Sequence, residues 1–278
     1  MTTLEFTFLA GLGSLLAGFL GSLTGLGGGV VVVPLLTLGF GVDIRYAIGA
    51  SLVSVIATSS GAAAAYVKEG YSNIRIGMFL EIATTLGALA GATAAAILPT
   101  STIAVIFGLV LIYSAYLSGR VQSEAASDDK PDRWATLFKL QGAYPTPGGF
   151  KVYYARAIPA GFALMFGAGV LSGLLGIGSG AVKVLAMDQA MRLPFKVSTT
   201  TSNFMIGVTA AASAGVYLNR GYIDPGLAMP VMLGVLAGSL LGARVLVRAH
   251  TRVLRIVFAL VIVLLGAQMI YNGLTGRF

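Results

Sequence analysis

When the chain is shifted by 151 residues, the stretch from the first glycine-rich cassette to near Ser118 aligns without a gap with the residues 151 positions later. The shift pairs two glycine-rich cassettes and several residues that follow them: Gly25 with Gly176, Gly27 with Gly178, Gly29 with Gly180, Ser51 with Ser202, Thr58 with Thr209, Gly87 with Gly238 and Gly91 with Gly242. Solenoid repeats are much shorter and usually occur in three or more copies. Two long apolar halves, each interrupted at the same place, favour instead a binding site between two membrane-embedded repeats.

The composition is that of an integral membrane protein. Of the 278 residues, 56% are hydrophobic and only 10% are charged, and the mean hydropathy is +0.89. A water-soluble chain of this length could not cover so much apolar surface. The net charge of +8 comes largely from a central linker and one late loop, as expected for cytoplasmic loops, so we expect no nucleic-acid partner. Because the chain has no cysteine, disulfides, thiolate metal sites and cysteine nucleophiles are excluded.

Each half contains five apolar segments. They run over 6–24, 30–40, 46–66, 74–98 and 102–118 in the first half, and over 158–175, 181–191, 197–218, 227–247 and 254–274 in the second. Four segments in each half approach the ~20 residues that cross a bilayer, whereas the second is too short and directly follows the glycines. We therefore expect an all-α polytopic membrane protein of two repeats with about five helical elements each, giving eight full spans and two half-helices.

Charged loops give the two repeats opposite orientations. The loop before the last segment is strongly basic, with Arg244, Arg248, His250, Arg252 and Arg255, whereas the equivalent residues 98–102 are uncharged. Since cytoplasmic loops are enriched in Lys and Arg, equivalent loops are predicted to face opposite sides, as in an inverted-topology repeat. The same rule predicts a multi-pass protein of the inner membrane, with residues 68–75 inside and both termini outside. Arg45 and Arg220 are exceptions that this topology leaves outside.

Three regions follow from this division. Residues 1–118 form the first membrane repeat, 119–157 a cytoplasmic linker and 158–278 the second membrane repeat. Within the linker, 136–140 and 150–154 flank a stretch rich in Pro and Gly, which predicts a small hairpin. We expect this linker to be structural.

The cassettes and the residues after them carry a family resemblance. The pattern consists of Gly25-Leu26-Gly27-Gly28-Gly29 followed by Val33-Pro34, of Gly176-Ile177-Gly178-Ser179-Gly180 followed by Lys183-Val184, and of Ala50-Ser51 with Thr201-Ser202-Asn203. Nearly the whole chain resembles the TauE/SafE family of sulfite and sulfonate exporters. Two departures are Ser179, which replaces the middle glycine of the second motif, and Leu185, which stands where Pro34 would match. The resemblance implies transport of a small sulfur oxyanion or organosulfonate.

The chemistry of the cassettes also favours an anion. A helix that begins inside the membrane directs unpaired backbone N–H groups and the positive end of its dipole at a ligand. Lys183 adds a full charge one turn later, and the hydroxyl-rich run that begins the next helix can donate hydrogen bonds. The predicted substrate-binding residues are Gly28, Gly29, Ser51, Ser179, Gly180, Lys183, Thr200, Ser202 and Asn203. Glu81, in the fourth segment, is a candidate for proton coupling.

Each of these features has an alternative interpretation. The glycines could serve only helix packing, Lys183 could extend to the membrane interface, and the hydroxyl run could simply cap its helix. Glu81 could have a packing role. An anion channel is the main alternative to a carrier, and a non-transporting scaffold or receptor is a more distant one. We expect no enzyme, no catalytic residue, no cofactor and no metal, because the single histidine lies in a basic loop and the cassette is neither a Walker nor a Rossmann motif. The expected partners are a small anion and the lipid bilayer, and a homo-oligomer is left open.

Overall fold

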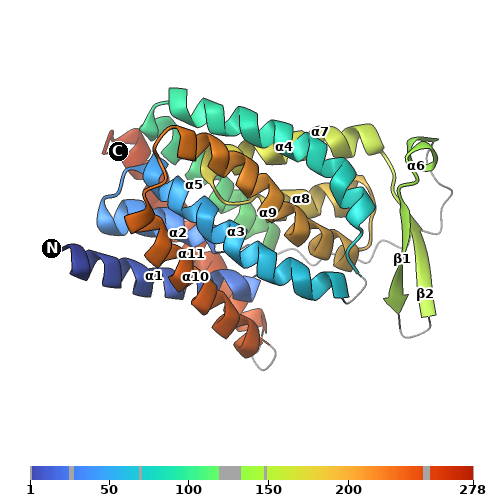
Figure 1. Cartoon of the computed structure of the whole chain (residues 1–278), viewed down its shortest axis with the longest axis horizontal. Coiled ribbons are helices and arrows are strands. Elements are labelled where there is room, and N and C mark those ends of the chain that lie inside the picture. Colours follow the sequence, from blue (N-terminus) through green and yellow to red (C-terminus); the bar gives the residue numbers. More distant parts are fainter. Residues whose placement is uncertain are drawn as a thin grey trace.

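The structure is a computed structural model that describes residues 2–24, 28–68, 71–118, 133–146, 149–246 and 251–277. Over these residues it is helical except for one hairpin (Figure 1). The elements in chain order are α1 (Thr3–Thr24), α2 (Gly29–Pro34), the π-helix η1 (Leu35–Gly39), α3 (Ile44–Lys68), α4 (Ile74–Ile97), α5 (Thr100–Ser118), α6 (Arg133–Leu137), β1 (Gln141–Thr146), β2 (Gly149–Tyr154), α7 (Ile158–Leu175), α8 (Gly180–Leu185), the π-helix η2 (Ala186–Ala190), α9 (Phe195–Asn219), α10 (Pro225–Leu246) and α11 (Thr251–Leu274).

The long helices have the lengths and surfaces of membrane spans. Among the described residues, four are long and apolar enough to cross a bilayer, within α1, α4, α7 and α10, and several shorter apolar helices accompany them. Large apolar side chains project from the outer faces of these helices, for example Phe8, Ile82 and Leu233, each more than half exposed. An all-α membrane protein explains this surface, because lipid rather than water can surround such side chains.

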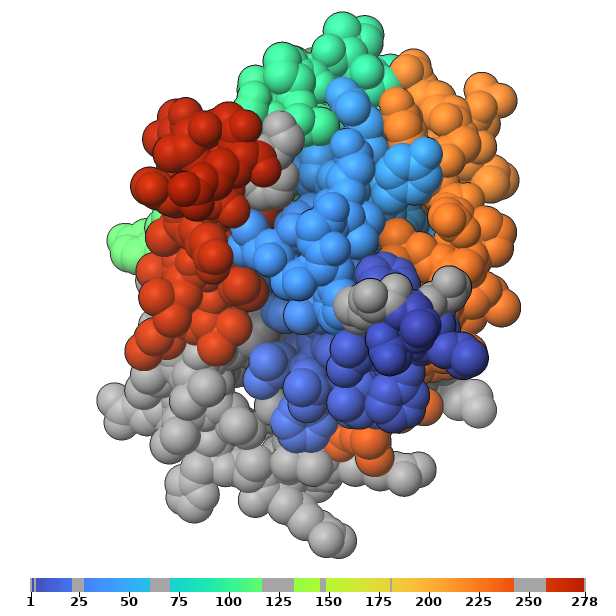
Figure 2. Space-filling view, turned by 90° about the vertical axis from the view of Figure 1, so that its left-hand side faces the viewer, coloured from blue at the N-terminus to red at the C-terminus, as the bar shows by residue number. Residues whose placement is uncertain are grey.

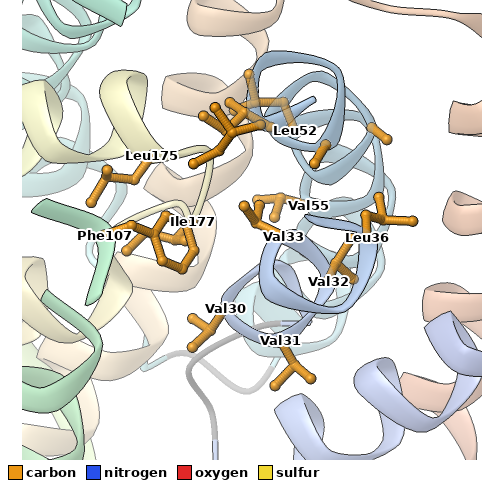
Figure 3. Close-up of a cluster of buried hydrophobic side chains, with 14 of the residues drawn as sticks. Val30, Val31, Val32, Val33, Leu36, Leu52, Val55, Phe107, Leu175 and Ile177 are labelled. Atoms are coloured by element: carbon orange, nitrogen blue, oxygen red, sulfur yellow. The ribbon is translucent and has the colours of Figure 1, made fainter. Parts of the chain in front are cut away.

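The short helices α2 and α8 lie inside the bundle, and both continue directly into π-helices. Every residue of α2 is buried. Figure 3 shows its valines gathered with Leu52 and Val55 of α3, with Phe107 of α5 and with Leu175 and Ile177 of the second half. η1 and η2 occupy equivalent places in the two halves, 151 residues apart. In the first, Thr37 Oγ1 donates to the carbonyls of Val33 and Pro34 at 2.9 and 3.3 Å, which satisfies backbone groups where the regular helix changes.

Helices of one half pack against helices of the other in two equivalent pairs: α1 packs on α10, and α7, the equivalent of α1, packs on α4, the equivalent of α10. In Figure 1, α4 and α7 form one edge of the bundle and α1 and α10 the other. The residues in contact in one pair correspond to those in the other pair by the 151-residue offset. A Cβ on Gly87 would meet the carbonyl oxygen of Phe166, and one on the equivalent Gly238 would meet that of the equivalent Leu15. Glycine is required at both positions because the helix backbones approach so closely.

The last helix of one half runs antiparallel to the last helix of the other. Gly108 of α5 lies against Gly266 of α11, whereas Gly273, later in α11, lies against Ser101 at the start of α5. Equivalent helices of two halves related by a simple translation would run in the same direction. In this pair, equivalent helices of the two halves therefore run in opposite directions.

The linker forms a small unit at one end of the bundle. The start of α1 and the end of α11 lie at the opposite end, which faces the viewer in Figure 2. A hairpin is present, but the prediction of a strand at 136–140 is wrong. The first strand is β1, and the residues before it belong to α6 and a turn. Pro145 lies within β1 opposite Phe150, and a two-stranded sheet tolerates it because each strand has an edge that needs no amide donor.

Asn73 joins this unit to the membrane helices. Its side-chain oxygen caps α4 by accepting from the amide of Ile76, while its Nδ2 donates to the hydroxyl of Tyr153 at 2.7 Å. Its own backbone amide donates to Thr201 Oγ1 of α9 at 3.0 Å. Tyr153 is buried in a cluster that also includes Met187 and Met191 at the end of the second short helix. The hairpin is thus packed on the elements that follow the second glycine cassette.

Arg45, one of the two exceptions to the charge rule, has a structural role. Its guanidinium donates to the carbonyls of Ala95 and Leu98 at 3.2 and 2.9 Å, and it lies over the ring of Tyr222. These carbonyls belong to the last turn of α4, where the helix itself supplies no amide donors. A cation at a helix C-terminus is favourable for the helix dipole, and this accounts for an arginine at this position whichever side of the membrane it faces.

Candidate functional site

The second cassette, residues 176–180, contains the non-helical break between α7 and α8. Gly176 and Gly178 adopt positive φ angles of 68° and 72°, and Ser179 has a φ of 49°, which is rare for a residue with a side chain. Ser179 is the N-cap of α8, and its buried hydroxyl oxygen has no hydrogen-bond partner in the structure. A strained residue that directs an unpaired hydroxyl into the protein interior is a typical feature of a binding site.

The two cassettes approach each other around two equivalent residues, Val55 and Ile206. A Cβ on Gly178 would meet both of these side chains, one on Gly29 would meet Val55, and one on Gly180 would meet Ile206. Ser51 Oγ donates to the carbonyl of Gly176 at 2.8 Å and Ser202 Oγ donates to that of Gly180 at 3.2 Å. The structure therefore brings together five of the predicted site residues: Gly29, Ser51, Ser179, Gly180 and Ser202.

Other predicted site residues lie around this group or away from it. Gly28 is the N-cap of α2, but it faces Val235 and Gly18 rather than the second cassette. Thr200 is buried on α9, and its hydroxyl donates to the carbonyl of Lys196 in its own helix. Asn203 is half-buried beside Ser202. Residues 25–27 of the first cassette lie outside the described residues.

Lys183 is completely buried, one turn into α8. Its Nζ donates to Thr209 Oγ1 of α9 at 2.5 Å. In this structure the side chain therefore points into the bundle and does not extend to a membrane interface. A buried ammonium group is expensive in free energy unless other groups compensate it, so such a lysine needs an anionic neighbour.

Glu81 of α4 supplies that neighbour. Thr209 Oγ1 lies 2.6 Å from Glu81 Oε1, and Thr85 Oγ1 donates to the same oxygen at 3.2 Å. The hydroxyl of Thr209 therefore lies between the ammonium group of Lys183 and the carboxylate of Glu81 and contacts both. The second carboxylate oxygen, Oε2, is buried without a hydrogen-bond partner. The two candidate residues that the sequence placed in different halves, 102 positions apart, thus belong to one network.

Thr209 is a site residue that the sequence analysis did not select. It was visible only as a residue identical in both repeats, paired with Thr58. Its position seven residues after Ser202, two helical turns along the same face of α9, is the signal that could have identified it. Asp188 was also missed. This buried acid lies in η2, and one of its carboxylate oxygens has no partner.

The polar network exists in only one of the two equivalent places. At the same offset, Lys183 corresponds to Val32, Thr209 to Thr58 and Glu81 to Met232. Thr58 donates only to the carbonyls of Ser54 and Val55 in its own helix. The repeats therefore share a backbone plan, but of the two equivalent places between them only one contains the buried pair of Lys183 and Glu81.

This arrangement can hold a small anion through backbone N–H groups, hydroxyls and one ammonium group. Within the described residues, no group of three or more His, Cys, Asp or Glu side chains could hold a metal ion. The charged groups of the network comprise one cation and one carboxylate, which suits charge compensation and proton exchange better than general acid and base chemistry on a bound substrate.

Comparison with known proteins supports a membrane transporter. The sequence profile of the family described as "Sulfite exporter TauE/SafE" matches residues 10–269. The chain is 30% identical to the "Probable membrane transporter protein YunE" of Bacillus subtilis over 98% of this chain and 99% of that protein. It is 28% identical to the "Probable membrane transporter protein YdhB" of the same organism, over 85% and 86% of the two chains. A "Probable membrane transporter protein" of Xylella fastidiosa is 25% identical over 93% and 92%. No solved structure matches the chain significantly.

Proposed function

This chain belongs to the TauE/SafE family of membrane transporters, and we propose that it exports a small sulfur-containing anion such as sulfite, sulfoacetate or a related organosulfonate. The observation that carries the proposal is Lys183, a fully buried cation one turn into a helix that begins inside the bundle at a glycine-rich break. Neither a soluble enzyme nor a purely structural membrane protein needs a charge in that position.

The proposed architecture is a pair of inverted-topology repeats with eight full spans, two short helices and a cytoplasmic linker. The antiparallel α5 and α11 support it, as does the equivalent packing of α1 on α10 and of α7 on α4. The hairpin lies at the end opposite both termini, as a cytoplasmic linker with external termini requires. In such folds the substrate binds between the repeats, and each side gains access in turn.

The proposed anion site lies where the two cassettes meet. Backbone N–H groups at the starts of α2 and α8 and hydroxyl groups from α3, α8 and α9 surround it, and Lys183 provides the charge. The full proposed set is Gly28, Gly29, Ser51, Ser179, Gly180, Lys183, Thr200, Ser202 and Asn203. Of these, the unpaired hydroxyl of Ser179 is the group that most needs a ligand, because a buried hydroxyl without a partner costs about 1–3 kcal/mol.

A thermal-stability screen of the purified chain tests the proposal. Sulfite, sulfate, thiosulfate, sulfoacetate, taurine and chloride are compared, and we expect at least one sulfur-containing anion to raise the unfolding temperature in a saturable manner. If folded protein responds to none of them, the export proposal is wrong and a scaffold or receptor is favoured. Flux in proteoliposomes then separates a carrier, which saturates and shows counterflow, from an anion channel.

Lys183→Met is the decisive variant. A charge-assisted hydrogen bond is worth about 1.5–3 kcal/mol, so we expect anion affinity to fall by about one to two orders of magnitude. Lys196→Met is the matched control, because Lys196 is exposed at the start of α9 and lies over the ring of Tyr71, outside the network. Unchanged affinity in folded Lys183→Met protein would remove this residue from the site.

A further inference from the structure

The hydroxyl of Thr209 has two acceptors but only one hydrogen. Glu81 Oε1 lies 2.6 Å from Thr209 Oγ1, and the carbonyl oxygen of Met205 lies 2.9 Å from it. Lys183 Nζ donates to the same oxygen, so the hydroxyl cannot use that direction to donate. Thr209 can therefore donate either to the carboxylate of Glu81 or to the backbone of its own helix. The hydroxyl therefore has two arrangements, and in only one of them does it donate a hydrogen bond to Glu81.

The charges around this hydroxyl are few. α4 packs against α7 and α9, and α7 contains no charged residue. The one charged residue of α9, Lys196, lies over the ring of Tyr71, and the second charged residue of α4, Arg75, is exposed at the start of its helix. α3, which also packs on α9, has its charged residues Arg45 and Lys68 at its two ends. Asp188 of η2 lies more than one helical turn beyond Lys183, and η2 contains no other charged residue. When both groups are charged, Lys183 and Glu81 therefore compensate each other through their shared contact with Thr209.

Resting on the function proposed above, we propose that Lys183 binds the transported anion only as Glu81 takes up a proton, with Thr209 switching between the two states. An anion beside Lys183 would place two negative charges against one positive charge in a poorly solvated site, which is strongly unfavourable. A proton taken from water by Glu81, at the unpartnered Oε2, removes one of them. Thr209 then donates its hydrogen bond to the carbonyl oxygen of Met205, and the ammonium group of Lys183 binds the anion.

The consequence is that anion and proton move together. A monovalent anion with one proton carries no net charge, so its transport does not depend on the membrane potential, whereas uniport of the same anion would depend on it strongly. Because linkage is reciprocal, acid must tighten anion binding by the same factor by which the anion favours protonation. At the equivalent place the 151-residue offset puts Val32 and Met232, which are apolar, so the repeat does not supply a second site of this kind there.

Isothermal titration calorimetry of the full chain in detergent tests this coupling. The probes are sulfate and methanesulfonate, whose charges stay constant between about pH 5 and pH 9, whereas sulfite itself binds a proton near neutral pH. Titrations in two buffers of different ionisation enthalpy at the same pH give the number of protons taken up for each anion bound. We expect uptake approaching one proton at alkaline pH, and an affinity that rises by up to about tenfold for each unit of acidification.

Three variants identify the residues that are responsible for proton uptake on anion binding. Glu81→Gln should bind the probes without proton uptake and with an affinity independent of pH. Thr209→Val should weaken the coupling, whereas Thr58→Val, the equivalent change in the other half, should leave it intact. Binding by the unmodified protein without proton uptake overturns the inference and leaves the proposed function standing. A folded protein that binds no sulfur-containing anion overturns both. Full proton uptake in Glu81→Gln assigns the proton to another group and also overturns the inference.

Discussion

Ser51 and Ser202 are equivalent residues of the two halves, but Ser51 donates its hydroxyl across the molecule to Gly176, whereas Ser202 donates to Gly180 in its own half. The two hydrogen bonds are therefore not related by the repeat. The first joins α3 to the loop before α8, and the second joins α9 to the first turn of α8. Only the first fixes the position of one half against the other.

Removing the two hydroxyls should have unequal effects. Ser51→Ala leaves the carbonyl of Gly176 buried without this donor, and we expect a loss of about 1–3 kcal/mol in the free energy of unfolding. Ser202→Ala removes a longer bond to a helical carbonyl and should cost no more than about 1 kcal/mol. Chemical unfolding of both variants in a mild detergent makes the comparison. Equal losses would show that Ser51 does not hold the halves together.

Glycines that face another backbone should tolerate no side chain. A Cβ on Gly169 of α7 would collide with the carbonyl oxygen of Thr84 of α4, whereas Gly167 of the same helix has open space around that position. We expect Gly169→Ala to destabilise the protein by about 1–3 kcal/mol through forced separation of the helices. Gly167→Ala should be neutral or stabilising by up to about 1 kcal/mol, because alanine is the better helix former. Thermal unfolding of the two variants makes the comparison. Similar losses of stability in Gly169→Ala and Gly167→Ala would contradict this explanation.

Much of the architecture could be predicted because the sequence contains its own comparison. The 151-residue offset indicated which segments correspond, and the close approach at Gly87 and Gly238 follows from that correspondence. The short second element could be predicted from its length after the glycines. The change into a π-helix at Leu35 and Ala186 could not, because it depends on how the helix end packs among its neighbours and no local residue pattern specifies it.

The candidate site was predictable in its parts and not in its connections. Lys183 stood out as an isolated charge in an apolar segment, and Glu81 did so for the same reason. That one hydroxyl links them depends on how α4, α8 and α9 pack, which a single sequence does not reveal. The first strand of the hairpin was predicted too early because Pro145 was assigned to the loop, whereas it lies within β1; the second predicted strand lies within β2.

The hydrogen bond between Asn73 and Tyr153 should control docking of the hairpin. Burial raises the pKa of the Tyr153 phenol above its ordinary value of 10.0, and the hydrogen bond from Asn73 opposes part of this effect. The group therefore contributes stability that is fully present below about pH 10 and is lost as the pH rises through the folded-state pKa. Trp134, the only tryptophan in the chain, stacks on Phe138 in the same unit and reports its melting by fluorescence.

We expect Tyr153→Phe to lower the free energy of unfolding of this unit by about 0.5–1.5 kcal/mol and to remove its alkaline destabilisation. Tyr154→Phe is the control, because Tyr154 follows Tyr153 in β2 and is only half-buried. We expect it to change neither the free energy of unfolding nor the alkaline destabilisation. If the fluorescence transition of Tyr153→Phe still weakened above pH 10 as it does in the unmodified protein, another group would be responsible.

The proposed inversion of one half relative to the other makes a prediction that labelling can test. Arg75 and Gly226 are equivalent by the 151-residue offset, and both are exposed at the starts of α4 and α10. Because the chain lacks cysteine, single replacements by cysteine can be read without background. We expect Arg75→Cys to be shielded from a membrane-impermeant maleimide in intact cells and Gly226→Cys to react. Arg133→Cys, on the linker, should behave like Arg75→Cys. Labelling of Arg75→Cys and Gly226→Cys from the same side would exclude an inverted repeat. The symmetry of the repeats would then no longer support a binding site between them.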